Sequence, residues 1–336
     1  MIFPKDNAVY QNLNTSFTNF AELLVDLKEN SFTGCVQVSY WEYEGVLLLD
    51  SGSVVNAVEE MGGNQLFGPD AAKRVTTRAR DKDGSISVFA LSGEMVTMLA
   101  SVAKSEVIFE DLSTEFTSLE ALITKLRSED HTGYIEVDIK DDPRVGYIFL
   151  LAGRVIESLI TSQGEEISGT SILPRIVDYA STRGATFSVY RSAVEQALED
   201  SEEIMVSFDL PQLLEVWQDI LSVSEAAVDR HTKPNHFLNT YKETLIGIAD
   251  EYPFLDPFAA KFQYQNGEIK FSGEARKNFS QGIASGLLGT LENIDAQLSD
   301  VDLLAEVRAD LGQVKQEHSE LIERFNLSVL LPGLLV

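Results

Sequence analysis

Residues 32–58 read FTGCVQVSYWEYEGVLLLDSGSVVNAV, and most of the architecture follows from them. Apolar and polar residues alternate after Gly34, and an unbroken apolar run, VLLL, follows Gly45. Alternation is typical of a half-buried strand, whereas a short unbroken apolar run indicates a buried one. The sequence DSG at 50–52 is a turn signal, and a third strand is expected over Ser53–Val58. This stretch therefore predicts three consecutive strands of an antiparallel meander.

The same pattern returns as HTGYIEVDIKDDPRVGYIFLLAGRVIESLI at residues 131–160. Residues 8–38 align without gaps with 107–137 at an offset of 99, and a longer second loop then changes the offset to 101. Self-similarity at a fixed spacing is the signature of repeated structural units, so the chain carries two copies of one module. The nine identical pairs of the ungapped segment are Leu13/Leu112, Thr15/Thr114, Phe17/Phe116, Thr18/Thr117, Leu23/Leu122, Leu27/Leu126, Thr33/Thr132, Gly34/Gly133 and Val38/Val137.

Helices are predicted on both sides of each meander. Apolar residues at helical spacing precede it, and Thr18 and Thr117 are the expected N-caps. A second helix is expected at about 64–80 and 166–182, followed by a closing strand at 86–89 and 187–190. The order α-β-β-β-α-β predicts an α+β fold in which helices pack on antiparallel sheets. Short apolar segments at 9–10 and 108–109 are candidates for one further strand in each module.

The pattern resembles the PATAN domain, the N-terminal domain of PatA-type bacterial response regulators, and is equally similar to archaeal proteins that carry the same unit. The resemblance covers about residues 8–190 and implies protein–protein contacts in signalling or polarity systems, without enzymatic activity. The second copy has Leu151 where the first has Asp50, so this aspartate is not a site common to both. The matching positions are Leu23, Leu24, Leu27, Thr33, Gly34, Gly45, Leu47, Asp50, Gly52, Val54 and Ala57, and Leu122, Ile123, Leu126, Thr132, Gly133, Gly146, Ile148, Gly153, Val155 and Ser158.

The repeat stops at about residue 191, and a mainly helical region is predicted beyond it. An acidic connector or helix end at 195–203 leads to an amphipathic helix at 210–221, and a second amphipathic helix, 237–252, is stopped by Pro253. Asn266-Gly267 suits the turn of a β-hairpin near 259–272. We therefore expect three domains, at 1–104, 105–200 and 201–336.

The end of the chain supplies the candidate partner-binding residues. A helix is expected at about 274–298, and an a/d pattern restarts after Ser299, which suits a helical hairpin or a dimer contact. The final ten residues, LSVLLPGLLV, carry no charged side chain, so they either dock into the core or bind a partner. The residues proposed for such a partner contact are Leu321, Phe325, Leu327, Val329, Leu330, Leu331, Leu334 and Leu335.

Charge and composition narrow the classes of function. The 336 residues include 53 acidic and 26 basic side chains, a net charge of −27, which repels nucleic acid and anionic lipid. Such a charge favours a basic partner, although a salt-adapted proteome would produce it equally well. No apolar run reaches the length of a membrane span, and the N-terminus lacks the features of a secretory signal. We expect a cytoplasmic protein that does not insert into membranes.

The sequence shows no catalytic or metal-binding constellation. His231 and His236 flank a proline turn without a metal-ligand spacing, and Cys35 opens a core strand, which favours a buried structural thiol. Gly62-Gly63 is expected to precede a helix, either as a plain loop or as an anion-binding N-terminus. No phosphate-binding or nucleophile motif occurs, so we expect no cofactor and no enzymatic activity.

Two functions from different classes remain open. The first is an adaptor or scaffold in an intracellular regulatory system, which binds other proteins or forms a homodimer through its C-terminal helices. The second is a regulatory sensor that binds a small ligand between the modules, which a polar-lined cavity there would support.

Overall fold

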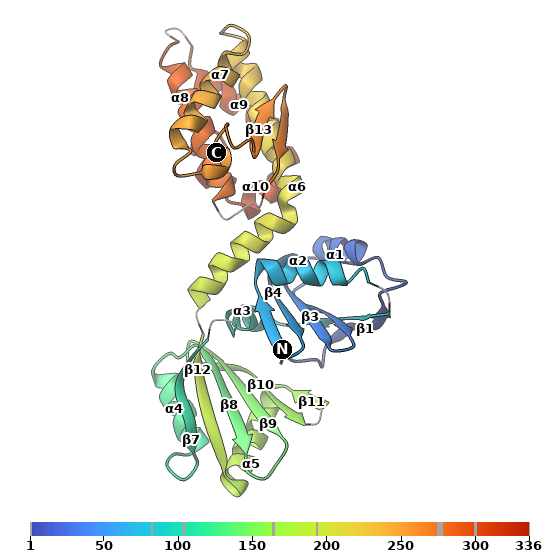
Figure 1. The fold of residues 1–336 in the computed structure, drawn as a ribbon. Helices are drawn as coiled ribbons and strands as arrows, with labels where there is room; N and C mark the ends of the chain where they lie inside the picture. The colour runs from blue at the N-terminus through green and yellow to red at the C-terminus, as the bar shows by residue number, and fades with distance from the viewer. Residues whose placement is uncertain are drawn as a thin grey trace. The chain divides into compact units, whose positions relative to one another are not determined.

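The computed structural model describes residues 2–81, 83–102, 105–162, 165–192, 194–273, 278–298 and 301–335, apart from the side chains of 165, 170, 195–200 and 202. The chain forms two compact units, Met1–Met205 and Val206–Val336 (Figure 1). The first unit holds both repeats, and the second holds the helical region with its hairpin. The α+β fold predicted from the sequence is therefore confirmed.

The two repeats have the same topology. Each is a six-stranded antiparallel sheet, in the order β1-β6-β2-β3-β4-β5 and, for the second, β7-β12-β8-β9-β10-β11. The further strand expected before each first helix is present as β1 and β7. The first repeat comprises β1 (Ala8–Asn14), α1 (Phe20–Glu29), β2 (Gly34–Tyr40), β3 (Tyr43–Asp50), β4 (Ser53–Met61), β5 (Asn64–Phe67), α2 (Pro69–Arg78) and β6 (Ser85–Ala90). The second comprises β7 (Glu106–Ser113), α4 (Leu119–Ser128), β8 (Gly133–Ile139), β9 (Val145–Leu151), β10 (Arg154–Ser162), β11 (Glu165–Ser168), η1 (Thr170–Ile172), α5 (Leu173–Arg183) and β12 (Ala185–Arg191).

The threonine and glycine shared by both repeats tie the meander to the closing strand. Thr33 Oγ1 accepts a hydrogen bond of 3.0 Å from the Ser51 N–H, and Thr132 Oγ1 accepts one of 3.0 Å from the Ala152 N–H. A Cβ atom on Gly133 would stand 1.9 Å from the Tyr190 carbonyl oxygen, and Gly34 faces Phe89 in the same way. The repeated motif therefore serves the fold, because only glycine lets the two backbones approach so closely.

Three local predictions were wrong. The second helix of each repeat begins later than expected, because a short strand, β5 or β11, first extends the meander. Gly62 and Gly63, with φ of +57° and +80°, form the β4–β5 hairpin turn and do not precede a helix, so the suggested anion site at a helix N-terminus is absent there. The N-caps are Asn19 and Ser118, one residue after the expected threonines, and their side chains accept backbone N–H groups of the first turn.

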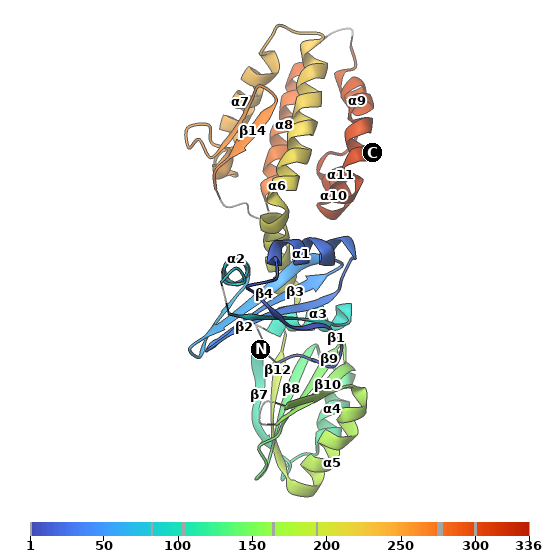
Figure 2. The same cartoon turned by 90° about the vertical axis from the view of Figure 1, so that its right-hand side faces the viewer.

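Helix α3 (Gly93–Val102) was not predicted and joins the two repeats (Figure 2). It contacts β2, β3 and β4 of the first repeat and β9 and β10 of the second. Met95, Met98 and Leu99 are buried in a core cluster that also includes Phe149 and Leu159 of the second repeat. Because apolar residues surround this helix on most sides, it lacks the one-sided periodicity that reveals a surface helix.

The other face of each sheet is covered by that repeat's own helices. Helix α2 packs on β3 and β4, and α5 contacts β8, β10 and β12. In the second repeat, Leu122, Leu126 and Ile176 of α4 and α5 meet Ile135 and Val137 of β8 in one apolar cluster. In the first unit, each sheet thus has helices of its own repeat on one face and contacts α3 on the other.

The second unit is mainly helical with one hairpin, as expected. Helix α6 starts before the unit boundary and runs unbroken through Pro211, so the expected connector at 195–203 is helical backbone; most of its side chains lie outside the described residues. Asn266 and Gly267, with φ of +55° and +75°, form the hairpin turn. The elements are α6 (Val194–Asp229), α7 (His236–Ile248), η2 (Pro253–Leu255), β13 (Phe262–Gln265), β14 (Glu268–Phe271), α8 (Phe279–Asp295), α9 (Leu303–Glu317), α10 (Ser319–Arg324) and α11 (Leu327–Leu330).

The expected a/d stretch is divided into short helices. Helix α9 ends at Glu317, and His318 Nε2 lies 2.9 Å from Asp219 Oδ2 of α6. Asn326, with φ of +51°, separates α10 from α11. The helix restart expected at Ser299 falls on a residue outside those described, whereas Asp302 is the N-cap of α9 and accepts the Ala305 N–H at 3.0 Å. This fold-back suits a hairpin arrangement within the unit better than a long coiled coil.

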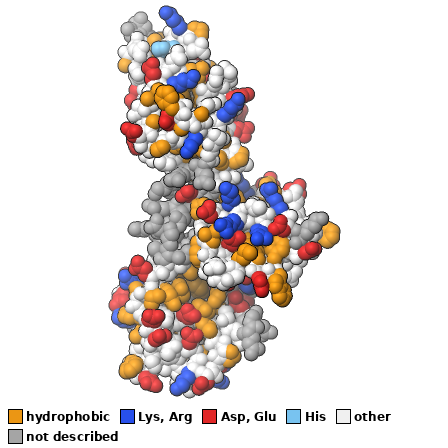
Figure 3. Space-filling view, in the orientation of Figure 1, with side chains coloured by type: hydrophobic (Ala, Val, Ile, Leu, Met, Phe, Trp, Pro, Cys, Tyr) orange, Lys and Arg blue, Asp and Glu red, His pale blue; other side chains and the backbone are white. Residues whose placement is uncertain are grey.

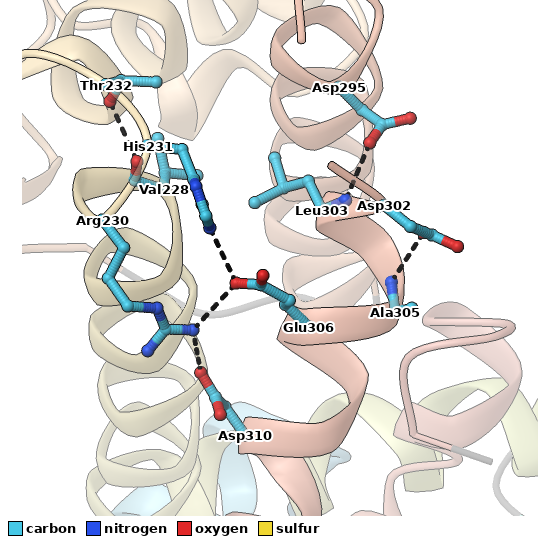
Figure 4. Close-up of polar contacts among 10 residues, drawn as sticks. All are labelled: Val228, Arg230, His231, Thr232, Asp295, Asp302, Leu303, Ala305, Glu306 and Asp310. Atoms are coloured by element: carbon cyan, nitrogen blue, oxygen red, sulfur yellow. Dashed lines mark hydrogen bonds and ion pairs between the residues drawn. The ribbon is translucent and has the colours of Figure 1, made fainter. Parts of the chain in front are cut away.

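Charged contacts join the end of α6 to α9 (Figure 4). The Arg230 guanidinium reaches Asp310 at 2.5 Å and Glu306 at 3.4 Å, and His231 Nε2 lies 2.9 Å from Glu306 Oε2. These partners hold the pKa of Glu306 below its usual range, with the His231 hydrogen bond as the main cause. His231 thus contacts a carboxylate of α9 within the fold. No group of three potential metal ligands occurs among the described residues.

Candidate ligand-binding site

The predicted partner-binding residues lie mostly inside the second unit. Leu321, Phe325 and Leu330 are partly buried against the core of that unit, and Val329 alone is largely exposed, at 74%. Helix α11, which is part of the tail, contacts α8. Arg308 of α9 donates a hydrogen bond to the Gly333 carbonyl. The tail is therefore docked in the core of the second unit, which is the first of the two alternatives that the sequence left open. The fully buried members of the set are Leu327, Leu331, Leu334 and Leu335.

A larger site lies in the first unit, where the two repeats meet. A cavity of about 950 Å³ is lined by residues of β2 to β5 on one side and of β8 and β9 on the other. Figure 3 shows a recess bordered by apolar side chains between the two repeats. This volume lies in the range that holds small-molecule ligands, which is about 300–1,000 Å³.

One wall is a row of polar residues that crosses the first sheet. Ser39 pairs with Glu44, Glu44 with Glu60, and Glu60 with Gln65, so the four side chains share one face. Gln65 Nε2 donates a hydrogen bond of 2.9 Å to Glu60 Oε2, which orients that carboxylate. Glu44 and Glu60 are both half-buried and line the cavity. Two carboxylates therefore lie side by side on this wall.

The opposite wall is aromatic, with one carboxylate. Tyr147 donates a hydrogen bond of 3.3 Å to Glu136 Oε1 across β8 and β9. Tyr134 lies beside Phe149, with ring centroids 6.1 Å apart, and stacks on Tyr190 at 4.4 Å. Burial raises the pKa of Glu136, and the nearby charge of Asp138 raises it further. The wall thus combines aromatic faces with an acidic group that the surroundings destabilise in its charged form.

The charged side chains among the described lining residues are all acidic. Glu42, Glu44, Glu60 and Glu136 all contribute, and the described lining residues include no lysine, arginine or histidine. Carboxylates in a partly enclosed site create a negative potential that water screens less than at an open surface. Chemically, the cavity offers hydrogen-bond acceptors, aromatic faces and negative charge.

The N-terminal segment lies beside this region and connects the repeats. Phe3 is fully buried, edge-on to Phe89 at 5.7 Å, in the cluster that contains residues of both repeats. Ser168 of β11 donates a hydrogen bond to Asp6. Cys35 is buried in the same cluster, which confirms the expected buried thiol, and burial raises its pKa.

The partly buried Glu166 of β11 predicts a pH dependence of the stability of the first unit. Burial raises the pKa of Glu166 from 4.5 to about 7, although the charge of Lys5 opposes the shift. A raised carboxyl pKa means that the protonated form favours the folded state, so this stabilisation is complete below about pH 4.5 and is lost as pH rises through about 7. We expect the thermal midpoint of the first unit to fall between pH 5 and pH 7.5, and Glu166→Gln to remove this part of the fall.

Calorimetric scans at several pH values would measure this effect. Glu115→Gln is the matched control, because Glu115 is exposed in the same repeat. An unchanged slope in Glu166→Gln would contradict the assignment of the pH dependence to this carboxyl.

Sequence reasoning did not identify these cavity residues. Glu44, Glu60 and Glu136 sit at polar positions of alternating strands, where a solvent-exposed face is the ordinary expectation. The available signal was the tyrosine-rich composition of the same faces, at Tyr134 and Tyr147. His131 at the start of the second meander is buried, and its Nε2 lies 3.0 Å from the Tyr190 carbonyl oxygen.

The fold and the cavity together define a tandem-repeat α+β protein with a candidate site between the repeats. The chain belongs to the family described as "uncharacterized protein conserved in archaea (DUF2226)", which matches residues 1–103 and again residues 100–199. These matches confirm the duplication and the similarity to archaeal proteins inferred from the sequence. No curated protein and no solved structure matches the chain. Among the described helices, none has both the length and the apolar character needed to cross a bilayer.

Proposed function

We propose that this protein is a regulatory sensor that binds a small ligand between its two repeats. The observation that supports this function is the cavity of about 950 Å³, whose walls come from both repeats. A ligand that contacts both walls stabilises the arrangement in which the repeats are together, because binding favours whichever state offers more contacts. The repeats would then transmit occupancy to a partner or to the helical region.

A cavity-filling variant tests this function. Ser39 lines the cavity from β2, so Ser39→Trp should fill part of it, whereas Thr186→Trp places the same side chain at an exposed position of β12. We expect at least one member of a panel of amino acids, nucleotides, sugars, dicarboxylates and amines to raise the thermal midpoint of the wild-type protein. A ligand at one hundred times its Kd contributes about 2.7 kcal/mol.

The two variants decide where such a ligand binds. Binding should persist in Thr186→Trp and be lost in Ser39→Trp. If no compound in the panel stabilises the wild type, or if Ser39→Trp binds as well as wild type, the cavity is not a ligand site.

An adaptor role is the second candidate, and one observation favours it. Phe17 and Phe116 occupy equivalent positions in the two repeats and are 91% and 86% exposed. Exposed phenylalanines are typical anchors in protein–protein interfaces. The resemblance to PATAN domains, and the protein contacts in signalling that it implies, also favours this role. The adaptor would act in the cytoplasm as a non-enzymatic scaffold for a protein partner or a second copy of the chain.

Paired substitutions test the adaptor role. We expect Phe17→Ser with Phe116→Ser to reduce recovery of a specific protein partner in cross-linking and affinity purification, while the unfolding midpoint stays nearly unchanged, because both rings contribute little to the core. Val25→Ser, at an exposed position of α1, is the control for loss of exposed apolar surface. Equal recovery with wild type and with the double variant would exclude these phenylalanines as anchors.

A further inference from the structure

We infer that an exposed basic surface of the first repeat binds an acidic segment of a partner protein that also carries large apolar side chains. The inference goes beyond the proposed ligand site and does not depend on it. Figure 3 shows Lys and Arg side chains gathered on the visible face of the first repeat. This surface, the α2 surface, consists of five exposed residues: Trp41 of the turn between β2 and β3, Lys73, Arg74, Arg78 and Arg80.

The charge of this segment is opposite to that of the chain as a whole. Residues 69–81 hold four basic side chains and two acidic ones, Asp70 and Asp81, whereas the whole chain has 53 acidic and 26 basic residues. Arg78 lies 3.7 Å from Asp81, but both side chains are largely in solvent, where an ion pair is weak. The segment therefore presents net positive charge to the solvent.

Contacts within the fold account for only part of this positive charge. Arg74 lies 3.4 Å from Glu59, which is buried and gains a counter-charge. Among the described residues, neither Lys73 nor Arg80 has a carboxylate partner, and both side chains are exposed. Arg74 and Arg78 are also four residues apart on α2, a spacing at which like charges destabilise a helix. The basic residues are thus not explained by the stability of the helix.

The second repeat shows that the module folds without this surface. Val75 of α2 lies against Gly45, and Ile176 of α5 lies against Gly146, so the two helices are equivalent. The segment equivalent to 69–81 is 170–182, which holds one basic and one acidic side chain. The second repeat also contains no tryptophan. A surface that one copy of a duplicated fold lacks serves a purpose other than folding.

The apolar part of the α2 surface is Trp41, whose side chain is 91% exposed. The hydroxyl of the preceding residue, Tyr40, lies 2.5 Å from the Arg78 carbonyl oxygen and 2.9 Å from that of Asp81. These contacts place the turn beside the end of α2. Glu42 is also exposed in this turn, so the positive charge belongs to the helix and the apolar area to the turn. Tryptophan and arginine are the residues most enriched among the anchors of protein interfaces.

The two parts of the α2 surface together indicate the chemistry of the partner. Basic side chains bind carboxylates, and an exposed indole ring is stabilised by contact with apolar side chains. A segment in which glutamates or aspartates flank leucines and phenylalanines satisfies both. A nucleic acid fits less well, because the net charge of −27 repels a long polyanion beyond the limits of this surface.

Fluorescence anisotropy of the full chain with a labelled synthetic peptide tests the inference. The peptide alternates pairs of glutamates with leucine and phenylalanine, and a second peptide has glutamines in place of the glutamates. We expect the acidic peptide to bind at low salt, more weakly as salt rises, and roughly tenfold more tightly than the glutamine peptide. Binding should also shift the emission of Trp41 to shorter wavelength, whereas the other tryptophan, Trp217, is already fully buried.

Charge reversal on α2 locates the contact. Lys73→Glu with Arg80→Glu should raise the Kd for the acidic peptide roughly tenfold, because two attractive charges become repulsive. Lys125→Glu with Arg127→Glu is the matched control, since it reverses two exposed charges in the last turn of α4 and changes the net charge equally. The control should leave the Kd within about twofold of wild type.

Removal of the indole ring tests the apolar part. We expect Trp41→Ser to raise the Kd for the acidic peptide roughly tenfold and to leave the unfolding midpoint nearly unchanged, because the ring contributes little to the core. Phe258→Ser removes another exposed ring, 86% exposed in the second unit, and should leave the Kd within about twofold of wild type.

Other results would overturn the inference. Equal binding of the two peptides would show that charge does not select the partner, and an unchanged Kd in Lys73→Glu with Arg80→Glu would place the contact elsewhere. If oligothymidylate or phosphatidylglycerol vesicles bind through the α2 surface and the peptide does not, the partner is a nucleic acid or a membrane. If the peptide does not bind and the wild type self-associates unless these charges are reversed, the partner is a second copy of the chain. If nothing binds, the inference fails, while the test of the ligand site between the repeats is unaffected.

Discussion

Gly133→Ala should destabilise the second repeat by about 3–5 kcal/mol, a size reserved for substitutions that break a specific structural requirement. The new methyl group would stand 1.9 Å from the Tyr190 carbonyl oxygen and close to the His131 ring. The Tyr190 carbonyl is fixed because Gly133 pairs with Arg191 in the ladder between β8 and β12. The His131 ring is held by its 3.0 Å contact with the same carbonyl oxygen. Relief of the clash requires the two strands to separate, which costs backbone hydrogen bonds as well as packing.

The equivalent substitution in the first repeat provides an internal replicate. A Cβ on Gly34 would stand 2.1 Å from the Phe89 carbonyl oxygen, so Gly34→Ala should cost a similar amount. Gly93→Ala, at the start of α3, is the matched control, because nothing lies within 4 Å of its Cβ position. Calorimetric unfolding of the three variants measures the effect, and equal midpoints for Gly133→Ala and Gly93→Ala would contradict the steric explanation.

These glycines show why the fold could be predicted from the sequence. The Thr-Gly pair recurs in both repeats because each repeat needs the same threonine hydrogen bond and the same close approach. Duplication made the pattern visible twice, and alternation along 34–58 revealed the strands. The meander and the α+β class could therefore be predicted, because the interactions that determine them are visible in short stretches of the sequence.

The elements that the prediction missed depend on tertiary contacts. Helix α3 is buried between two sheets, so its apolar residues do not follow one face. Strands β5 and β11 have only four residues each, and pairing with β4 and β10 determines their conformation. The helical periods assigned to 64–80 and 166–182 were right only for their later parts.

The candidate cavity could not be predicted for a related reason. Alternation along a strand shows which residues share a face, but it does not show what lies opposite that face. Glu60 and Glu136 come from different repeats and line one cavity only because α3 and the N-terminal segment join the repeats. The environment that these two residues share arises when the two repeats pack together, so it cannot be read from the sequence of either repeat alone.

The C-terminal tail gives the second substitution with a large effect. Leu331 is fully buried, so Leu331→Ala should lower the free energy of unfolding of the second unit by about 2–5 kcal/mol, from lost apolar burial and the cavity left behind. Val329 lies two residues earlier and is 74% exposed. We therefore expect Val329→Ala to change the free energy of unfolding of the second unit by no more than about 0.5 kcal/mol. The two substitutions remove methyl groups from one short tail and differ mainly in burial.

Urea unfolding monitored by tryptophan fluorescence measures this difference. Trp217 is fully buried in the second unit, and its indole N–H donates to Ser280 Oγ at 3.1 Å, so its emission reports loss of that core. Trp41 is 91% exposed in the first unit and changes its surroundings little on unfolding. If Leu331→Ala left the Trp217 transition unchanged, the tail would not be part of the core, and its leucines would again be candidates for a partner contact. A large shift for Leu331→Ala with none for Val329→Ala would leave the exposed Val329 as a residue of the tail that a partner could reach.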